Sequence, residues 1–322
     1  MIRRVTVRSL AKINLDLRVL HRRSDGYHEL RTVFQTISLS DSIDIEFEAS
    51  RRTALELDDS LGIPDNLVLR AARAVLGAMR VHAHVKFRLT KKIPMGGGLG
   101  GGSSNAAAVL LALPVLAGKR LDLETLMDLG TRLGSDVPFF LVGGTALGIG
   151  RGTELFELPE VRTQPLVLVC PGVHVSTSEA YAGLGRGLTV TPSSSKMNSF
   201  RAYVGLLGEV RSASAASSLS ANDFEAAVFR EHPPLRGLPG RLKKLGATGA
   251  AMTGSGSAVF GLFDSREQRN AAAEALRRDG QAVVAADLVS RKSYRTLWRR
   301  QLSEHLRSSG TEWPPHSRYL RT

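Results

Sequence analysis

A glycine-rich run between two apolar segments constrains this chain more than any other feature. Residues 94–105 read PMGGGLGGGSSN, with six glycines around a single leucine. Backbone amides in such a run can approach a ligand that Cβ atoms would keep at a distance. Ser103, Ser104 and Asn105 are typical N-cap residues, and the apolar residues after them predict a helix that begins at Ala106. Because free N–H groups at a helix start attract phosphate, the run predicts a phosphate-binding loop.

Three other interpretations of this run were weighed. A flexible linker is a common role for glycine runs, but linkers are flanked by polar sequence, whereas this run lies between an expected strand at 84–89 and an apolar helix. A Walker loop needs Gly-Lys-Ser/Thr, and no lysine follows Gly102. A dinucleotide-binding GxGxxG can be drawn through the run, yet residues 91–94 separate it from the strand. No ribose-binding acid follows cleanly about 20 residues later.

The pattern of apolar residues predicts an α+β fold. Helical spacing indicates helices at 66–77, 106–117, 123–133 and 266–278, and another that starts at 176. Strands are expected at 5–19, 43–48, 84–89, 166–170 and 281–286, with a loop that leads into a strand over 250–263. Polar stretches at 189–199 and 212–221 are expected to be loops. Because strands and helices mix without strict βαβ alternation, we expect antiparallel pairing.

Composition indicates a cytoplasmic globular protein with room for two domains. The chain has 322 residues, of which 43% are hydrophobic and 23% charged. Cys170 is its single cysteine, so an intramolecular disulfide is excluded and a reducing compartment is expected. The apolar stretch at 106–117 is shorter than the roughly 20 residues that span a membrane. The N-terminus lacks the apolar core of a signal peptide, and no membrane partner is expected.

The net charge of +13 depends strongly on the last residues of the chain. Basic residues concentrate after Ser290, and Tyr294, Trp298, Trp313 and Tyr319 are interleaved with them. Such a mixture also occurs in segments that bind nucleic acid. We expect a solvated basic extension over 291–322 and no nucleic-acid partner, with salt-dependent binding of DNA or RNA by this extension as the alternative.

Two segments contain candidate catalytic residues. Lys12 and Asn14 share one face of the first expected strand, opposite the apolar face, and the alternative is a plain solvent-exposed face. Asp136 precedes Pro138, a pair that is typical of a helix start. A carboxylate there is stabilised by the helix dipole, and it suits a general base or a group that orients a hydroxyl.

Five segments, taken in order, resemble the GHMP kinase superfamily. They are AKINL at 11–15, DGYHEL at 25–30, the glycine run at 94–105, LGSDVPFF at 133–140 and MTGSGSAVF at 252–260. The resemblance implies a two-domain α+β fold with the active site in the cleft between the domains. It implies a ribosomal protein S5 domain 2-like N-terminal domain at 1–160 and a ferredoxin-like C-terminal domain at 161–290. The extension at 291–322 has no counterpart in the pattern.

The same resemblance implies an ATP site. In the family the glycine loop wraps the ATP triphosphate, and the adenine pocket uses a segment that matches residues 66–67 and the lysine before the loop. Mg²⁺ is expected to bind through the nucleotide phosphates, and no protein ligand is assigned to it. The implied ATP-binding residues are Asn66, Lys92, Pro94, Gly96, Gly97, Gly98, Leu99, Gly100, Gly101, Gly102, Ser103, Ser104 and Asn105.

The resemblance also implies an acceptor site. The branch of the family that matches best phosphorylates the 2-hydroxyl of 4-diphosphocytidyl-2-C-methyl-D-erythritol (CDP-methylerythritol). Asp136 would accept or orient the hydroxyl proton, with Lys12 beside it. Tyr27 would stack on cytosine, His28 would bind the base edge, and Tyr181 would form a second aromatic wall; the implied substrate-binding residues are Asn14, Tyr27, His28, Thr177 and Tyr181. Homoserine, mevalonate or a sugar is the alternative acceptor, and a monomer or homodimer is expected.

Overall fold

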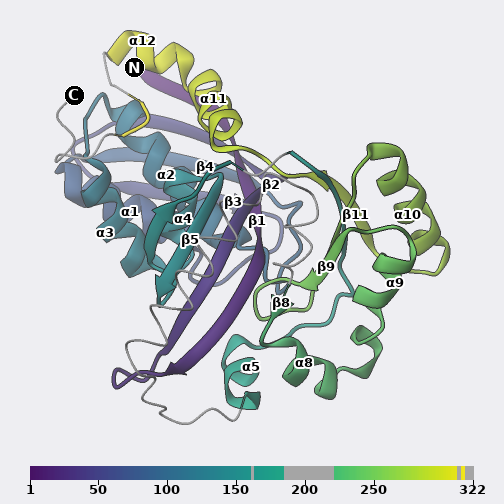
Figure 1. The fold of residues 1–322 in the computed structure, drawn as a ribbon. Coiled ribbons are helices and arrows are strands. Elements are labelled where there is room, and N and C mark those ends of the chain that lie inside the picture. The colour runs from purple at the N-terminus through teal and green to yellow at the C-terminus, as the bar shows by residue number, and fades with distance from the viewer. Residues whose placement is uncertain (161–162, 185–220, 310–312, 316–322) are drawn as a thin grey trace.

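The computed structural model describes residues 1–160, 163–184, 221–309 and 313–315. In this part of the chain the secondary structure is a mixture of strands and helices arranged around two sheets (Figure 1). The α+β fold class predicted from the sequence is confirmed. The polar stretch expected as a loop at 189–199 lies outside the described residues, as does all of the stretch at 212–221 except Ala221.

The first sheet is built on a long antiparallel hairpin. Strands β1 (Ile2–Arg22) and β2 (His28–Ala49) pair along most of their length. The later half of β2 pairs with β4 (Ala83–Thr90), and its earlier half pairs with β5 (Thr145–Gly150). The edges are formed by β3 (Ala54–Asp59), β6 (Glu154–Glu157) and the short β8 (Ala221–Asn222). The strand expected at 43–48 is therefore only the end of a 22-residue strand.

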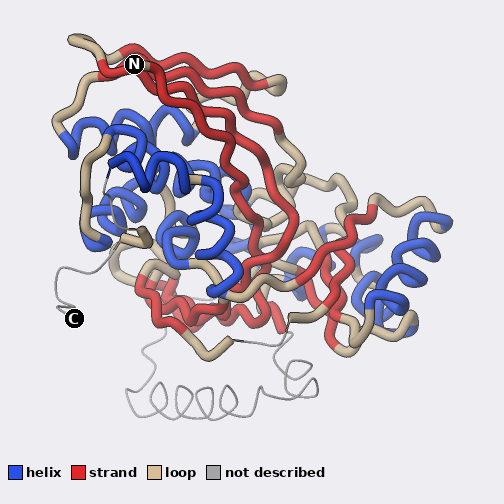
Figure 2. The backbone as a smooth tube through the Cα atoms, turned by 90° about the horizontal axis from the view of Figure 1, so that it is seen from above, coloured by secondary structure: helices blue, strands red, loops and turns tan. Residues whose placement is uncertain are grey.

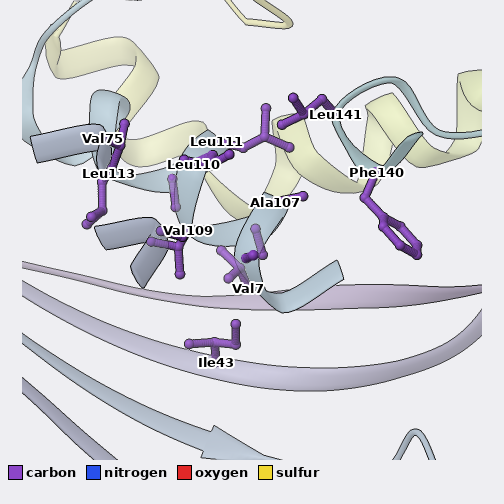
Figure 3. Close-up of a cluster of buried hydrophobic side chains, with 14 of the residues drawn as sticks. Val7, Ile43, Val75, Ala107, Val109, Leu110, Leu111, Leu113, Phe140 and Leu141 are labelled. Carbon is purple, nitrogen blue, oxygen red and sulfur yellow. The ribbon is translucent and has the colours of Figure 1, made fainter. Parts of the chain in front are cut away.

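Four helices cover one face of this sheet: α1 (Leu67–Met79), α2 (Gly101–Ala117), α3 (Leu123–Leu133) and α4 (Val137–Val142). Figure 2 shows them in blue on one side of the long red strands. Helix α2 is buried on all sides from Ser104 to Leu116, because its sequence is apolar around the whole helix. Its side chains meet the sheet at Val7 and Ile43 and the neighbouring helices at Val75 and Leu141 (Figure 3).

Helix α2 begins earlier than the sequence predicted. Gly100 is the N-cap, with φ +69°, and no side chain caps the helix. The predicted capping residues Ser103, Ser104 and Asn105 lie inside the first turns instead. The prediction that they cap the helix is wrong because the glycine conformation at residue 100 already starts the helical path.

The second sheet has the ferredoxin-like arrangement. Its strands are β7 (Pro165–Val169), β9 (Gly249–Met252), β10 (Val259–Leu262) and β11 (Val283–Asp287). They pair antiparallel in the order β11-β7-β10-β9, which is the order 4-1-3-2 of a split βαβ unit. The helices found among the described residues of this part are α5 (Thr177–Gly183), α8 (Glu225–Glu231), α9 (Leu238–Lys244) and α10 (Arg266–Arg278), with a 3-10 turn at Pro233–Leu235.

The two sheets share a hydrophobic cluster. Ile13 and Ile37 of the first sheet pack with Leu166 and Phe260 of the second, and all four are fully buried. The described chain contains no helix long and apolar enough to cross a membrane.

The chain returns to the first sheet after residue 290. Helices α11 (Arg291–Gln301) and α12 (Ser303–Ser309) lie beside the N-terminus of β1 (Figure 1). Tyr294, Trp298 and Trp313 are buried in the hydrophobic core between the first sheet and its helices. For the described residues the prediction of a solvated extension is therefore wrong: one side of α11 is basic, but its aromatic side is part of the core.

Candidate active site

A cavity of about 930 Å³ lies between the β1–β2 hairpin, the start of α4, and the part of the chain that carries the second sheet. Its walls come from β1, β2, α5, the start of α4 and the turn between β9 and β10. The cavity brings together every residue that we predicted to act on or hold the acceptor, together with two glycines of the loop: Lys12, Asn14, Tyr27, His28, Asp136, Thr177, Tyr181, Gly98 and Gly100.

Lys12 and Asp136 form an ion pair in the wall of this cavity. The Nζ atom of Lys12 is 3.4 Å from Oδ2 of Asp136, and it donates a hydrogen bond to Oδ1 of Asn14 at 2.6 Å. It also lies 5.5 Å from the centre of the Phe34 ring. The Lys12 side chain is 4% exposed, so the solvent-face alternative is wrong. A buried ammonium requires such partners, because desolvation alone would strongly disfavour it.

Asp136 stands at the N-cap position of α4, as its sequence predicted. Its carboxylate makes no capping hydrogen bond, however, and instead faces Lys12. The side chain is 33% exposed and lines the cavity. This carboxylate is therefore paired with a buried cation on one side and open to a ligand on the other.

Besides the bond from Lys12, the side-chain amide of Asn14 is oriented by two hydrogen bonds of 3.0 Å or less, and its backbone N–H makes one more. Its Nδ2 donates to Thr32 Oγ1 at 2.7 Å, while its Oδ1 accepts from the backbone N–H of Gly254 at 3.0 Å. The backbone N–H of Asn14 donates to Thr253 Oγ1 at 2.9 Å. The TGSGS segment, which lies between β9 and β10 of the second sheet, is therefore hydrogen-bonded to β1 of the first sheet. Its sequence marked the family, but no residue of it was predicted in the site.

The glycine loop is anchored just before it begins and again at its centre. Asp41, fully buried, accepts hydrogen bonds from the backbone N–H groups of Lys92 and Ile93 at 2.7 and 2.8 Å and forms an ion pair with Lys91. At the centre of the loop, the backbone N–H of Lys12 donates to the carbonyl of Leu99 at 3.0 Å. The loop is thus joined directly to β1, the strand that carries Lys12. The Lys92 side chain is exposed to solvent.

Several predicted ATP-binding residues use their side chains internally. The Ser104 hydroxyl donates to the Leu10 carbonyl at 2.7 Å, and Asn105 accepts a hydrogen bond from Ser9. Asn66 caps α1 through Val68 N–H and donates to Asp59. The start of α1 is nevertheless adjacent to the loop, since a Cβ on Gly102 would lie 3.6 Å from Leu67.

The three predicted aromatic residues all line the cavity, and two of them contact each other. The His28 and Tyr181 rings stack on each other at 4.5 Å with an interplanar angle of 15°, and Tyr181 meets Phe224 edge-on. Tyr27 is half exposed, and its ring is covered by the Arg151 guanidinium at 3.5 Å. Tyr181 therefore packs on His28 and lines the cavity, and its role as a second aromatic wall for the substrate stays a prediction.

The shifted pKa values of Tyr181 and His28 keep both rings uncharged at neutral pH. Burial, together with the charge of Asp136, raises the pKa of Tyr181 to about 12, so its hydroxyl remains a donor at neutral pH. Burial and the nearby Arg22 lower the pKa of His28, which keeps its imidazole neutral. A neutral imidazole presents one donor and one acceptor, the pattern that a nucleobase edge requires.

Two arginines on the cavity wall were missed by sequence reasoning. Arg22 lies at the end of β1, and Arg151 follows β5 directly. Their sequences contain no motif, and only the fold brings them to the same cavity. In the described chain no group of three or more His, Cys, Asp or Glu side chains is placed to hold a metal ion.

Comparisons with known proteins agree with this architecture. The GHMP kinases N-terminal domain matches residues 66–144, and the GHMP kinases C-terminal domain matches residues 202–282. A 4-diphosphocytidyl-2-C-methyl-D-erythritol kinase from Solibacter usitatus is 54% identical over 98% of both chains. The enzyme of the same name from Geobacter metallireducens is 37% identical over 88% of this chain and 97% of its own.

Solved structures give the same result. A crystal structure of 4-(cytidine 5'-diphospho)-2C-methyl-D-erythritol kinase is 37% identical, covers 89% of this chain and 99% of its own, and has a TM-score of 0.71. A homoserine kinase from Cytophaga hutchinsonii has a TM-score of 0.67 at 19% identity, over 89% of this chain and 95% of its own. At that identity the likeness concerns the fold.

Proposed function

Because the chain belongs to the GHMP kinases, and within them to the 4-diphosphocytidyl-2-C-methyl-D-erythritol kinases, we propose that it phosphorylates the 2-hydroxyl of CDP-methylerythritol with ATP. This reaction is a step of the non-mevalonate (MEP) pathway to isoprenoid precursors. The observation that carries the proposal is the Lys12–Asp136 pair in the wall of a cavity that the glycine loop also lines.

ATP, when bound, supplies the γ-phosphoryl group, and the glycine loop would hold its phosphates. The fit rests on the start of α2, where no side chain caps the helix and the first amides come from glycines. Gly98 and Gly100 line the acceptor cavity, so phosphates on this loop would reach the acceptor. We assign Mg²⁺ to the nucleotide phosphates without a protein ligand, since Mg²⁺ retains waters and binds substrate oxygens readily.

Asp136 and Lys12 would act on the acceptor side. Phosphoryl transfer asks a protein mainly for positioning and charge neutralisation. The open side of the Asp136 carboxylate would accept or orient the proton of the 2-hydroxyl. Lys12, held by Asn14 and Asp136, would place a fixed positive charge beside the group in transfer. Transfer would then be direct and in line, without a covalent enzyme intermediate.

The rest of the cavity suits a cytidine diphosphate group. Two arginines provide charge for a diphosphate, and guanidinium groups bind such oxygens in pairs. The neutral imidazole of His28 provides a donor and an acceptor for a base edge, and Tyr27 provides a ring for stacking. We propose that these residues select the nucleotide part of the substrate, and that Asn14 and Thr177 lie along its diol part.

The test is a panel of acceptors with and without the cytidine group. ADP release by the purified protein is measured with CDP-methylerythritol, methylerythritol phosphate, homoserine and mevalonate. We expect the highest kcat/KM with CDP-methylerythritol, by at least 100-fold, because a buried polar site discriminates strongly against a substrate that leaves it unpaired. A higher kcat/KM with homoserine or mevalonate would contradict the proposal. Asp136→Asn is the matched control for contaminating kinase activity.

A further inference from the structure

Helix α11 follows the last strand of the second sheet, returns to the first sheet and packs against the end of α4. Its buried residues are Arg291, Tyr294 and Trp298, and Leu302 follows at the C-cap. Figure 1 shows the helix beside the N-terminal strand, on the side of the sheet that α2 and α4 cover. The mechanism proposed above uses no residue of this segment.

Tyr294 holds the end of α4. Its hydroxyl donates a hydrogen bond to the carbonyl of Phe140, one of the last carbonyls of this six-residue helix. Such carbonyls have no partner within a helix and need one elsewhere when buried. The Tyr294 ring also covers Gly143, where an added Cβ would collide with it. Burial raises the pKa of Tyr294 far above neutrality, so the hydroxyl remains a hydrogen-bond donor.

Arg291 holds the chain just beyond α4. Its guanidinium donates to the carbonyls of Leu158 and Thr145, and its backbone N–H donates to Glu160 at 2.9 Å. A Cβ on Gly144 would meet the Arg291 backbone and side chain. Arg291, in the first turn of α11, therefore contacts both the residues that directly follow α4 and the residues that follow β6.

Helix α4 in turn touches each part of the transfer site. Asp136 is its N-cap residue. The Phe139 ring stacks on Phe34 at 5.0 Å, and Phe34 lies below the Lys12 ammonium. The Phe140 ring lies against Gly100 of the glycine loop, where an added Cβ would be 2.8 Å from it. A shift of α4 would thus move the carboxylate relative to the lysine and to the loop.

We propose that Tyr294 is a positioning residue for phosphoryl transfer: by holding the end of α4, it keeps Asp136 in register with Lys12 and the glycine loop. The inference rests on the proposed function of that site. Rates of transfer depend steeply on geometry, and a displacement of about 1 Å can cost on the order of 100-fold. A six-residue helix has few internal hydrogen bonds, so an external contact is well placed to set its position.

The test compares Tyr294→Phe with Leu302→Val. The first removes only the hydroxyl. The second trims a fully buried side chain at the C-cap of the same helix, where the backbone hydrogen bonds of Leu302 join α11 to α12. Both are assayed well below their unfolding temperatures. We expect Tyr294→Phe to lower kcat about tenfold with both KM values within twofold of wild type. Leu302→Val should keep kcat within twofold although its unfolding midpoint falls.

A second readout does not need activity. The ¹³Cγ resonance of Asp136, observed in Asp-labelled protein, should move in Tyr294→Phe and stay in place in Leu302→Val. Unchanged kcat and an unchanged resonance in Tyr294→Phe would overturn the inference, and so would equal kcat losses in the two variants. If wild type does not phosphorylate CDP-methylerythritol, the proposed function fails, and the resonance alone decides the role of Tyr294.

Discussion

Gly98→Ala is the substitution whose effect the structure defines most sharply. Gly98 has φ +70°, and a Cβ there would lie 2.2 Å from the backbone carbonyl oxygen of Thr253. Two costs follow. The left-handed conformation costs an L-residue about 1–2 kcal/mol. The collision costs a further 1–3 kcal/mol or so, because two backbone segments must separate by about 1 Å.

A matched control separates the two costs. Gly172 has φ +72°, and a Cβ there would meet nothing within 4 Å. Gly172→Ala should therefore lose about 1–2 kcal/mol of unfolding free energy, and Gly98→Ala about 2–5 kcal/mol. Urea unfolding at pH 7 measures both values.

Activity gives a second measurement of the same contact. Separation of the loop from the TGSGS turn would also move the loop away from Lys12, whose N–H is bonded to Leu99. We expect Gly98→Ala to lose at least tenfold in kcat/KM, with Gly172→Ala close to wild type. Equal stability losses in the two variants would refute the reasoning, because the close approach of the two domains would then contribute nothing.

Two further predictions concern single side chains. Burial raises the pKa of Asp16 from 3.8 to about 6, so the wild-type protein loses stability as pH rises through this window. Between pH 4 and pH 7, the unfolding free energy of Asp16→Asn should therefore gain about 2 kcal/mol relative to wild type, as measured by urea unfolding. A difference between the two proteins that does not depend on pH would contradict this. Arg151→Ala should raise the KM for CDP-methylerythritol about tenfold and leave the KM for ATP within twofold, with Arg88→Ala on the outer sheet face as control. A KM that Arg151→Ala does not change would exclude Arg151 from substrate binding.

Local signals predicted much of this fold. The caps and apolar spacing of α1, α3 and α10 depend on neighbours within a few residues, and the expected bounds agree with the structure to within about two residues. The pairing of Lys12 with Asp136 was foreseen from the family resemblance. Its burial was not, since the strand pattern alone was equally consistent with a solvent face.

Features that depend on distant contacts were missed or misread. Ser104 has the chemistry of a cap, but its hydroxyl finds the Leu10 carbonyl 94 residues away. The charge of residues 291–322 suggested a solvated segment. Tyr294, Trp298 and Leu302 nevertheless recur at four-residue spacing, and this apolar stripe is the signal that could have predicted a packed helix.

The most direct test of the proposed function is ³¹P NMR of a reaction that contains the purified protein, ATP, Mg²⁺ and CDP-methylerythritol. We predict one new phosphomonoester resonance, equal in amount to the ADP formed. With Asp136→Asn, the rate at which this product forms should fall by at least 100-fold. ADP without a new phosphomonoester would contradict the account. Product formation by Asp136→Asn at the wild-type rate would contradict the role given to the Lys12–Asp136 pair.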